Sequence, residues 1–290
     1  MKKTGIVLTI FFMATFLVLC GLGFFRSYYF SIPIEFVNAY QIPCTSIEIE
    51  GRSYPVEIDL GSKTALSLHK EVLDKISKDR CGVSRRLDFL GNKYETPLYF
   101  ISNVKIGSLL LRKIKAKEES SGFSAKSSIL IQAKENRSEG RLGRDFFSGK
   151  NLFMDFSHRI FIACSKLKDI EREGYETKKL AAIPFKSTAD GVILEIETDM
   201  GLAKFVLDTG TTASAIRKTR EALENEILAI ETSKFAMSGI DFGPRKLYLL
   251  DISPEFEEID GFLGMDFLNE HVVYLDFAKE VAYIAKTSRS

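Results

Sequence analysis

The chain has 290 residues, of which 45% are hydrophobic and 27% are charged, an ordinary composition for a globular protein with a substantial core. Its 40 basic and 39 acidic residues give a formal net charge of +1, which excludes a strongly basic chain and gives no indication of a nucleic acid partner, so none is predicted. The three histidines are scattered and no His or Cys cluster has metal-ligand spacing, so we expect neither a metal nor a cofactor.

The N-terminus begins with an apolar segment. Residues 5–25 carry no charge, follow Lys2 and Lys3, and end at Arg26. This run is long enough to span a bilayer as a helix, so residues 1–26 are predicted to be a membrane anchor or, alternatively, a cleaved signal segment. The two lysines favour a cytoplasmic N-terminus and an exported periplasmic or extracellular body, which signal cleavage would turn into a secreted protein.

Two stretches further along the chain resemble each other. Residues 56–62 read VEIDLGS and residues 205–211 read FVLDTGT, so in each an apolar strand pattern leads into an aspartate and a Gly-containing turn. Each stretch has a matching partner downstream, because residues 141–146 (RLGRDF) correspond to residues 262–267 (FLGMDF). The pattern indicates an internal duplication that could bring two aspartates face to face across a pseudo-two-fold axis.

The duplication also predicts the domain organisation. The first copy begins near Gln41 and the second near Ala182, and both alternate polar and apolar residues as strands do. The polar stretch between them is predicted to be a linker. The expected segments after the anchor are a connector at 27–40, a first lobe at 41–164, a linker at 165–181 and a second lobe at 182–290.

On these residues the chain resembles the retropepsin-like and pepsin-like aspartic proteases. The D-T-G-[ST] loop of that family matches residues 208–211, followed by its hydrophobic-hydrophobic-Gly segment at 262–264, and the first copy matches at Asp59, Gly61 and Ser62 and again at 142–143. The resemblance implies an all-β, bilobal fold made of two retropepsin-like β-barrel repeats in one chain. It also implies a catalytic pair, Asp59 and Asp208, supported by Gly61, Ser62, Thr209, Gly210 and Thr211.

Two coplanar carboxylates that share one proton can hydrolyse a peptide bond. The ionised member takes a proton from a water molecule, while the protonated member hydrogen-bonds the carbonyl oxygen of the substrate. The resemblance therefore implies an aspartic endopeptidase, monomeric with an intramolecular pseudo-dimer, whose partner is an extended peptide or protein substrate. Together with the apolar N-terminal segment, it predicts that this endopeptidase is membrane-anchored. It also implies that the hydroxyls of Ser62 and Thr211 hydrogen-bond the outer oxygens of the two carboxylates.

One residue departs from the family pattern. The family has Thr or Ser directly after each catalytic aspartate, and the two hydroxyls brace the pair across the lobes. Thr209 fits this pattern, but the side chain at the equivalent position, Leu60, can neither donate nor accept a hydrogen bond. The departure leaves an alternative open, namely a catalytically impaired peptide-binding or scaffolding module on the same fold.

The resemblance further implies a hairpin that closes over the cleft and excludes water. In the first copy the expected flap is residues 87–97, turning at Gly91 and carrying Tyr94. In the second copy the expected turn includes Phe242 and Gly243.

Overall fold

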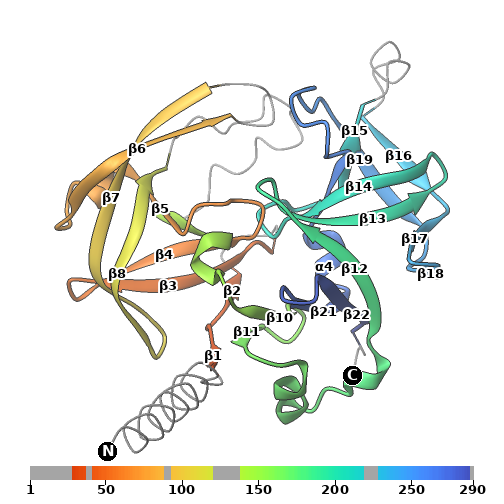
Figure 1. The fold of residues 1–290 in the computed structure, drawn as a ribbon, viewed down its shortest axis with the longest axis horizontal. Coiled ribbons are helices and arrows are strands. Elements are labelled where there is room, and N and C mark those ends of the chain that lie inside the picture. Colours follow the sequence, from red (N-terminus) through yellow and green to blue (C-terminus); the bar gives the residue numbers. More distant parts are fainter. Residues whose placement is uncertain (1–27, 37–40, 88–92, 120–137, 219–227, 288–290) are drawn as a thin grey trace, which may run out of the picture.

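The computed structural model describes residues 28–36, 41–87, 93–119, 138–218 and 228–287. Within these ranges the chain is built mainly from β-strands, and two lobes stand side by side above a shared sheet (Figure 1). This confirms the predicted all-β, bilobal fold. The membrane helix expected at residues 5–25 lies outside the described residues, and within the described ranges no helix is long and apolar enough to cross a bilayer.

The first lobe is an eight-stranded sheet with the order β2-β3-β4-β9-β5-β8-β7-β6, and it curls because β3 also pairs with β7. The hairpin between β3 and β4 turns at Glu50 and Gly51, which both have positive φ, as a tight two-residue hairpin turn requires. The strands of this lobe are β2 (Glu35–Phe36), β3 (Pro43–Ile49), β4 (Arg52–Asp59), β5 (Leu66–Leu68), β6 (Asp79–Leu87), β7 (Lys93–Ile106), β8 (Leu109–Glu118) and β9 (Gly140–Gly143).

The second lobe repeats this plan. Strand β14 runs parallel to β20 as β4 does to β9, β15 is antiparallel to β20 as β5 is to β9, and β13 pairs with β17 as β3 does with β7. Its strands are β13 (Val192–Thr198), β14 (Gly201–Leu207), β15 (Ala215–Arg217), β16 (Ala229–Thr232), β17 (Phe235–Met237), β18 (Ile240–Asp241), β19 (Arg245–Leu250) and β20 (Gly261–Leu263).

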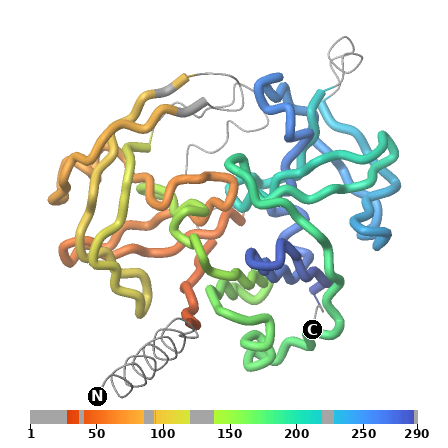
Figure 2. The backbone as a smooth tube through the Cα atoms, viewed as in Figure 1, coloured from red at the N-terminus to blue at the C-terminus, as the bar shows by residue number. Residues whose placement is uncertain are grey.

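A shared sheet joins the lobes, with the order β1-β11-β10-β21-β22-β12. Its central pairing places Phe153 opposite Tyr274, with Leu152 opposite Leu275 and Met154 opposite Val273, so the register is symmetric about the middle pair. In Figure 2 the C-terminal hairpins of the two halves, green and dark blue, meet below the lobes. The strands are β1 (Tyr29–Ser31), β10 (Asn151–Asp155), β11 (Ile160–Cys164), β12 (Ala181–Ser187), β21 (His271–Asp276) and β22 (Val281–Lys286).

Residues expected to form the connector at 27–40 instead contribute β1 and β2 to the two sheets, which corrects that expectation. Ser31 pairs with Ile162 on β11, and Ala182 pairs with Tyr283 on β22. Since the hairpins β10–β11 and β21–β22 are equivalent, Ser31 corresponds to Ala182. The first repeat therefore begins with β1, and the Ile-Pro dipeptide that directly follows this strand at 32–33 matches the one at 183–184.

Helical structure within the described residues is short and lies at junctions. The polar stretch between the lobes forms two 3-10 turns, η3 and η4, and the equivalent Gly143 and Gly264 each precede a short helix, η2 and α4. The helical elements are α2 (Lys70–Leu73), η2 (Arg144–Phe147), η3 (Leu167–Glu173), η4 (Thr177–Lys179) and α4 (Met265–Leu268). One continuous apolar core runs through both lobes and fixes their relative position.

Candidate active site

The two aspartates sit at equivalent strand ends at the interface between the lobes. Asp59 is the last residue of β4 and pairs with Gly143 on the parallel strand β9. Asp208 directly follows β14, and its backbone N–H donates to the Leu263 carbonyl on β20 at 3.0 Å. A Cβ atom at Gly143 would lie 2.5 Å from the Ser62 carbonyl oxygen, so a side chain there would displace the turn that follows Asp59.

Each aspartate is seated against the turn of the opposite lobe. A Cβ atom on Gly61 would lie 2.5 Å from Cγ of Asp208, and a Cβ atom on Gly210 would lie 2.6 Å from Cγ of Asp59. Such distances are closer than van der Waals contact allows, so only glycine fits at either position. The reciprocal contacts bring the two carboxyl groups together across the pseudo-two-fold axis.

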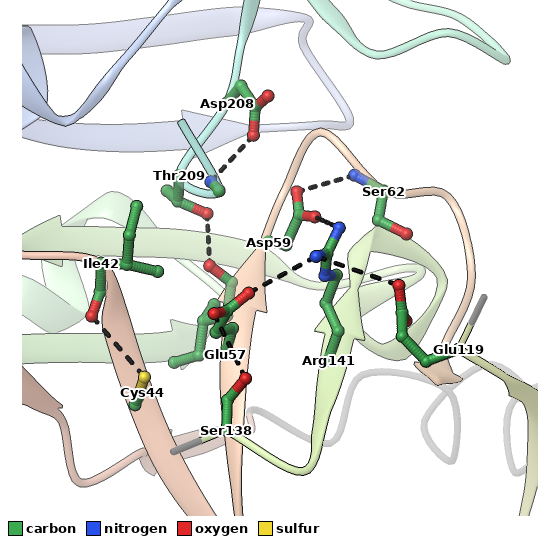
Figure 3. A network of polar contacts seen from close by, with 12 residues as sticks. Ile42, Cys44, Glu57, Asp59, Ser62, Glu119, Ser138, Arg141, Asp208 and Thr209 are labelled. Atoms are coloured by element: carbon green, nitrogen blue, oxygen red, sulfur yellow. Dashed lines mark hydrogen bonds and ion pairs between the residues drawn. The ribbon is translucent and has the colours of Figure 1, made fainter. Parts of the chain in front are cut away.

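Thr209 ties the two turns together beside the two aspartates (Figure 3). Its fully buried hydroxyl donates to the Ile58 carbonyl at 2.6 Å and accepts the Leu60 backbone N–H at 2.9 Å. The Leu60 side chain is only 1% exposed and belongs to the apolar core. The brace between the lobes is thus one-sided, with a hydroxyl on one turn and a packed leucine on the other.

The carboxylates are held by backbone amides rather than by the expected hydroxyls. The Ser62 N–H donates to Oδ1 of Asp59 at 2.9 Å, and the Gly210 N–H donates to Oδ1 of Asp208 at 2.8 Å. Among the described residues, the hydroxyls of Ser62 and Thr211 make no hydrogen bond to either carboxylate. For Asp59 the reason is that a guanidinium already occupies the second oxygen, since Arg141 Nη1 donates to Oδ2 at 2.8 Å.

The electrostatics of the pair favour a shared proton. Burial raises the pKa of Asp208, and the neighbouring charge of Asp59 and a side-chain hydrogen bond with it raise that pKa further. The Gly210 amide and the Arg141 charge oppose the rise without cancelling it. Two close carboxyl groups of which one keeps its proton can supply a general base and a general acid at the same time.

Arg141 was not predicted as a site residue. Besides Asp59, its guanidinium lies 3.5 Å from Oε2 of Glu57 and 3.9 Å from Oε1 of Glu119, and its side chain is 30% exposed. The sequence did contain a signal, because the duplicate of Arg141 is the apolar Phe262. A charged residue in place of an apolar one next to the candidate aspartate motif indicates a local role.

The expected flap residues have different outcomes. Gly91 lies outside the described residues, and only the backbone of Tyr94 is described, opposite Arg86 in the long β6–β7 hairpin. Phe242 is 7% exposed and packs edge-on against Phe267 in the core of the second lobe. This packing corrects the prediction that Phe242 and Gly243 form a flap. The two residues directly follow β18, a strand on the side of the second lobe away from the first (Figure 1).

No family model matches the chain, and no curated protein matches its sequence. Solved structures do match its fold. An aspartic proteinase from Irpex lacteus is 14% identical with a TM-score of 0.53, and the alignment covers 90% of this chain and 98% of that one. Basic 7S globulin from soybean is 10% identical with a TM-score of 0.56, covering 91% and 96%. The chain therefore has a pepsin-like fold.

Proposed function

We propose that this chain is an aspartic endopeptidase in which Asp59 and Asp208 hydrolyse peptide bonds. The observation that carries the proposal is the reciprocal seating of the two aspartates, each against the glycine of the opposite turn. The raised pKa of Asp208 supports it, because a dyad needs one protonated and one ionised member at working pH.

The reaction would proceed without a covalent intermediate. The ionised carboxylate takes one proton from water as the water oxygen bonds to the peptide carbonyl carbon, and the protonated carboxyl gives its proton to the carbonyl oxygen. The resulting diol collapses when its carbon–nitrogen bond breaks. The first carboxyl then protonates the leaving amine, and the second regains its proton from the diol.

The proposal also includes the kind of substrate and the location of the protein. An extended peptide or protein is the proposed substrate, bound by strand addition between the lobes of a single chain. Residues 5–25 are proposed to tether the protein to a membrane with its folded region exported, or to direct its secretion after cleavage. The tether would be supported if the full chain partitions into detergent and the protein without residues 1–27 is released into buffer.

The catalytic claim is tested with single substitutions. Peptide cleavage by the full chain is followed by mass spectrometry on a mixed peptide library, and Asp59→Asn and Asp208→Asn are each expected to abolish it. Asp74→Asn is the matched control, since it removes an exposed carboxylate that pairs with Lys70 on the surface. If both active-site variants cleave peptides as fast as the wild type, the proposed mechanism is wrong.

A second function is favoured by a specific observation. The one-sided brace at Leu60 and the guanidinium on Asp59 both depart from a symmetric dyad, and a peptide-binding module on the same fold would tolerate both departures. One of the two solved structures described above is named a globulin and not a proteinase, so the fold alone does not decide between hydrolysis and binding. This module would be favoured if the chain binds peptides without cleaving them. It would also be favoured if this binding is unaffected by a competing peptide whose scissile carbonyl is replaced by a secondary alcohol.

A further inference from the structure

The two lobes differ at one pair of facing residues beside the aspartates. In the second lobe, Val206 pairs with Phe262, and both side chains are buried and apolar. In the first lobe, the equivalent pair is Glu57 and Arg141. Burying a charged pair costs desolvation that an apolar pair avoids, and the second lobe forms the same strand pairing without charges. Stability of the fold therefore does not explain why the first lobe has them.

Within the charged pair, the Arg141 guanidinium points toward Asp59, and Glu57 lies against the guanidinium (Figure 3). Arg141 donates to Asp59 at 2.8 Å, while Glu57 and Glu119 stand behind the guanidinium at 3.5 and 3.9 Å. The Ser138 hydroxyl in turn donates to Oε1 of Glu57 at 3.2 Å. Carboxylates on several sides hold the guanidinium in one orientation, and a charge-assisted hydrogen bond of this length is strong.

The dyad is unsymmetrical as a result. Asp59 accepts one backbone amide and one guanidinium, whereas Asp208 accepts the Gly210 amide and, among the described residues, no guanidinium. Burial and the charge of Asp59 raise the pKa of Asp208, which favours the proton there. The charged groups of the described residues that interact with the pair are Arg141 on β9, Arg144 on η2 and Glu57 on β4, while Glu119 after β8 interacts with Arg141.

We infer that Arg141 is a positioning residue that keeps the negative charge of the dyad on Asp59 and leaves the shared proton on Asp208. The inference rests on the proposed function and assigns the roles within it: Asp59 takes the proton of the water, and Asp208 protonates the carbonyl oxygen. A guanidinium beside the pair also opposes protonation of both carboxyl groups, the state that ends activity at low pH. Arg141 thereby extends activity toward acid.

The test is the pH profile of kcat/KM for the full chain in detergent, measured on a peptide that the wild type cleaves. Arg141→Met should move the acid limb upward by about one pH unit or more, because a neighbouring cation is lost. Arg141→Lys keeps the charge and should leave the limb near its wild-type position. Lys204→Gln is the control, since it removes a cation from the strand leading to Asp208 that pairs with Glu258 on the surface.

A second variant keeps the test valid if Arg141→Met fails to fold. Glu57→Val combined with Arg141→Phe copies the pair that the second lobe already accommodates, and it should show the same upward shift with a wild-type circular dichroism spectrum. Acid limbs that superimpose on the wild type in both variants overturn the inference. If the Asn variants at the dyad are inactive and the limbs do not move, only this inference fails; if those Asn variants still cleave, the proposed function fails.

The protonation of the two carboxyl groups can also be measured directly, which tests the inference even if the protein does not cleave peptides. In full-length protein with carbon-13-labelled aspartate carboxyl groups, the NMR chemical shifts report the protonation of each carboxyl group. Over the pH range in which the pair holds one proton, Asp59 should show the shift of an ionised carboxylate and Asp208 that of a protonated carboxyl group. That difference should shrink in Arg141→Met. Equal protonation of the two carboxyl groups in the wild type would contradict the assignment.

Discussion

The backbone amide of Leu60 in the first lobe donates to the hydroxyl of Thr209 in the second lobe at 2.9 Å, and this hydroxyl in turn donates a hydrogen bond to the Ile58 carbonyl at 2.6 Å. One side chain therefore satisfies two buried backbone groups of the opposite turn. The contact couples the position of Asp59 to that of Asp208, because each lies next to one of these residues in the chain.

Thr209→Val removes the hydroxyl and keeps the shape of the side chain. We expect it to lower the free energy of unfolding by about 1–3 kcal/mol, since a buried N–H and a buried carbonyl lose their partner, and to lower peptide cleavage. Thr209→Ser keeps the hydroxyl and is the control. Chemical denaturation and cleavage rates check both variants, and a Val variant as stable and active as the Ser variant would contradict the coupling.

Leu60→Thr restores the residue type that the resemblance to aspartic proteases implies. Leu60 is buried in the apolar core, so the smaller, polar side chain should cost about 1–3 kcal/mol of stability. Thr209 already ties the turns together, so turnover should change little. The melting temperature and the cleavage rate are measured on the same preparation, and a raised melting temperature together with faster turnover would mean that the missing hydroxyl limits the dyad.

The sequence predicted the duplication and the strand ends that carry the aspartates, because apolar strands followed by Gly-containing turns leave a local pattern. It did not predict the polar contacts of the site. Arg141 reaches Asp59 only because β9 lies parallel to β4, a pairing between residues far apart in the chain. Strand β1 was missed because its partner is the distant β11, and Phe242 was misassigned because a turn signal does not tell which face of a lobe the turn occupies.

His271 should make stability fall in moderately acidic solution. Its ring is 1% exposed and stacks on Phe267, and burial lowers its pKa to about 4, although a hydrogen bond with the Phe267 carbonyl opposes this. The unfolded chain binds a proton near pH 6.5 and the folded chain does not until about pH 4, so stability is lost as pH falls between these values.

The expected loss from His271 is on the order of 3 kcal/mol across that window. Urea unfolding at a series of pH values measures it. His271→Asn keeps a donor near the position of Nδ1 and does not titrate, so its stability should depend less steeply on pH than that of the wild type. Equal slopes for the two proteins would show that His271 is not responsible.

Truncation separates the N-terminal segment from the fold. Removing residues 1–27 leaves β1 and β2 intact and should preserve the folded region. Removing residues 1–38 deletes both strands and takes Ile32 and Ile34, 1% and 6% exposed, out of the core. We expect the longer deletion alone to lower the melting temperature or prevent folding. Equal melting temperatures would mean that β1 contributes nothing to the shared sheet.

The central claim is that Asp59 and Asp208 act as one pair on a peptide. The most direct measurement is a crystal structure of the protein with a peptide whose scissile carbonyl is replaced by a secondary alcohol. The account predicts that this hydroxyl lies within hydrogen-bonding distance of both carboxyl groups, with Arg141 still bonded to the outer oxygen of Asp59. A peptide bound elsewhere, or carboxyl groups too far apart to share the hydroxyl, would contradict it.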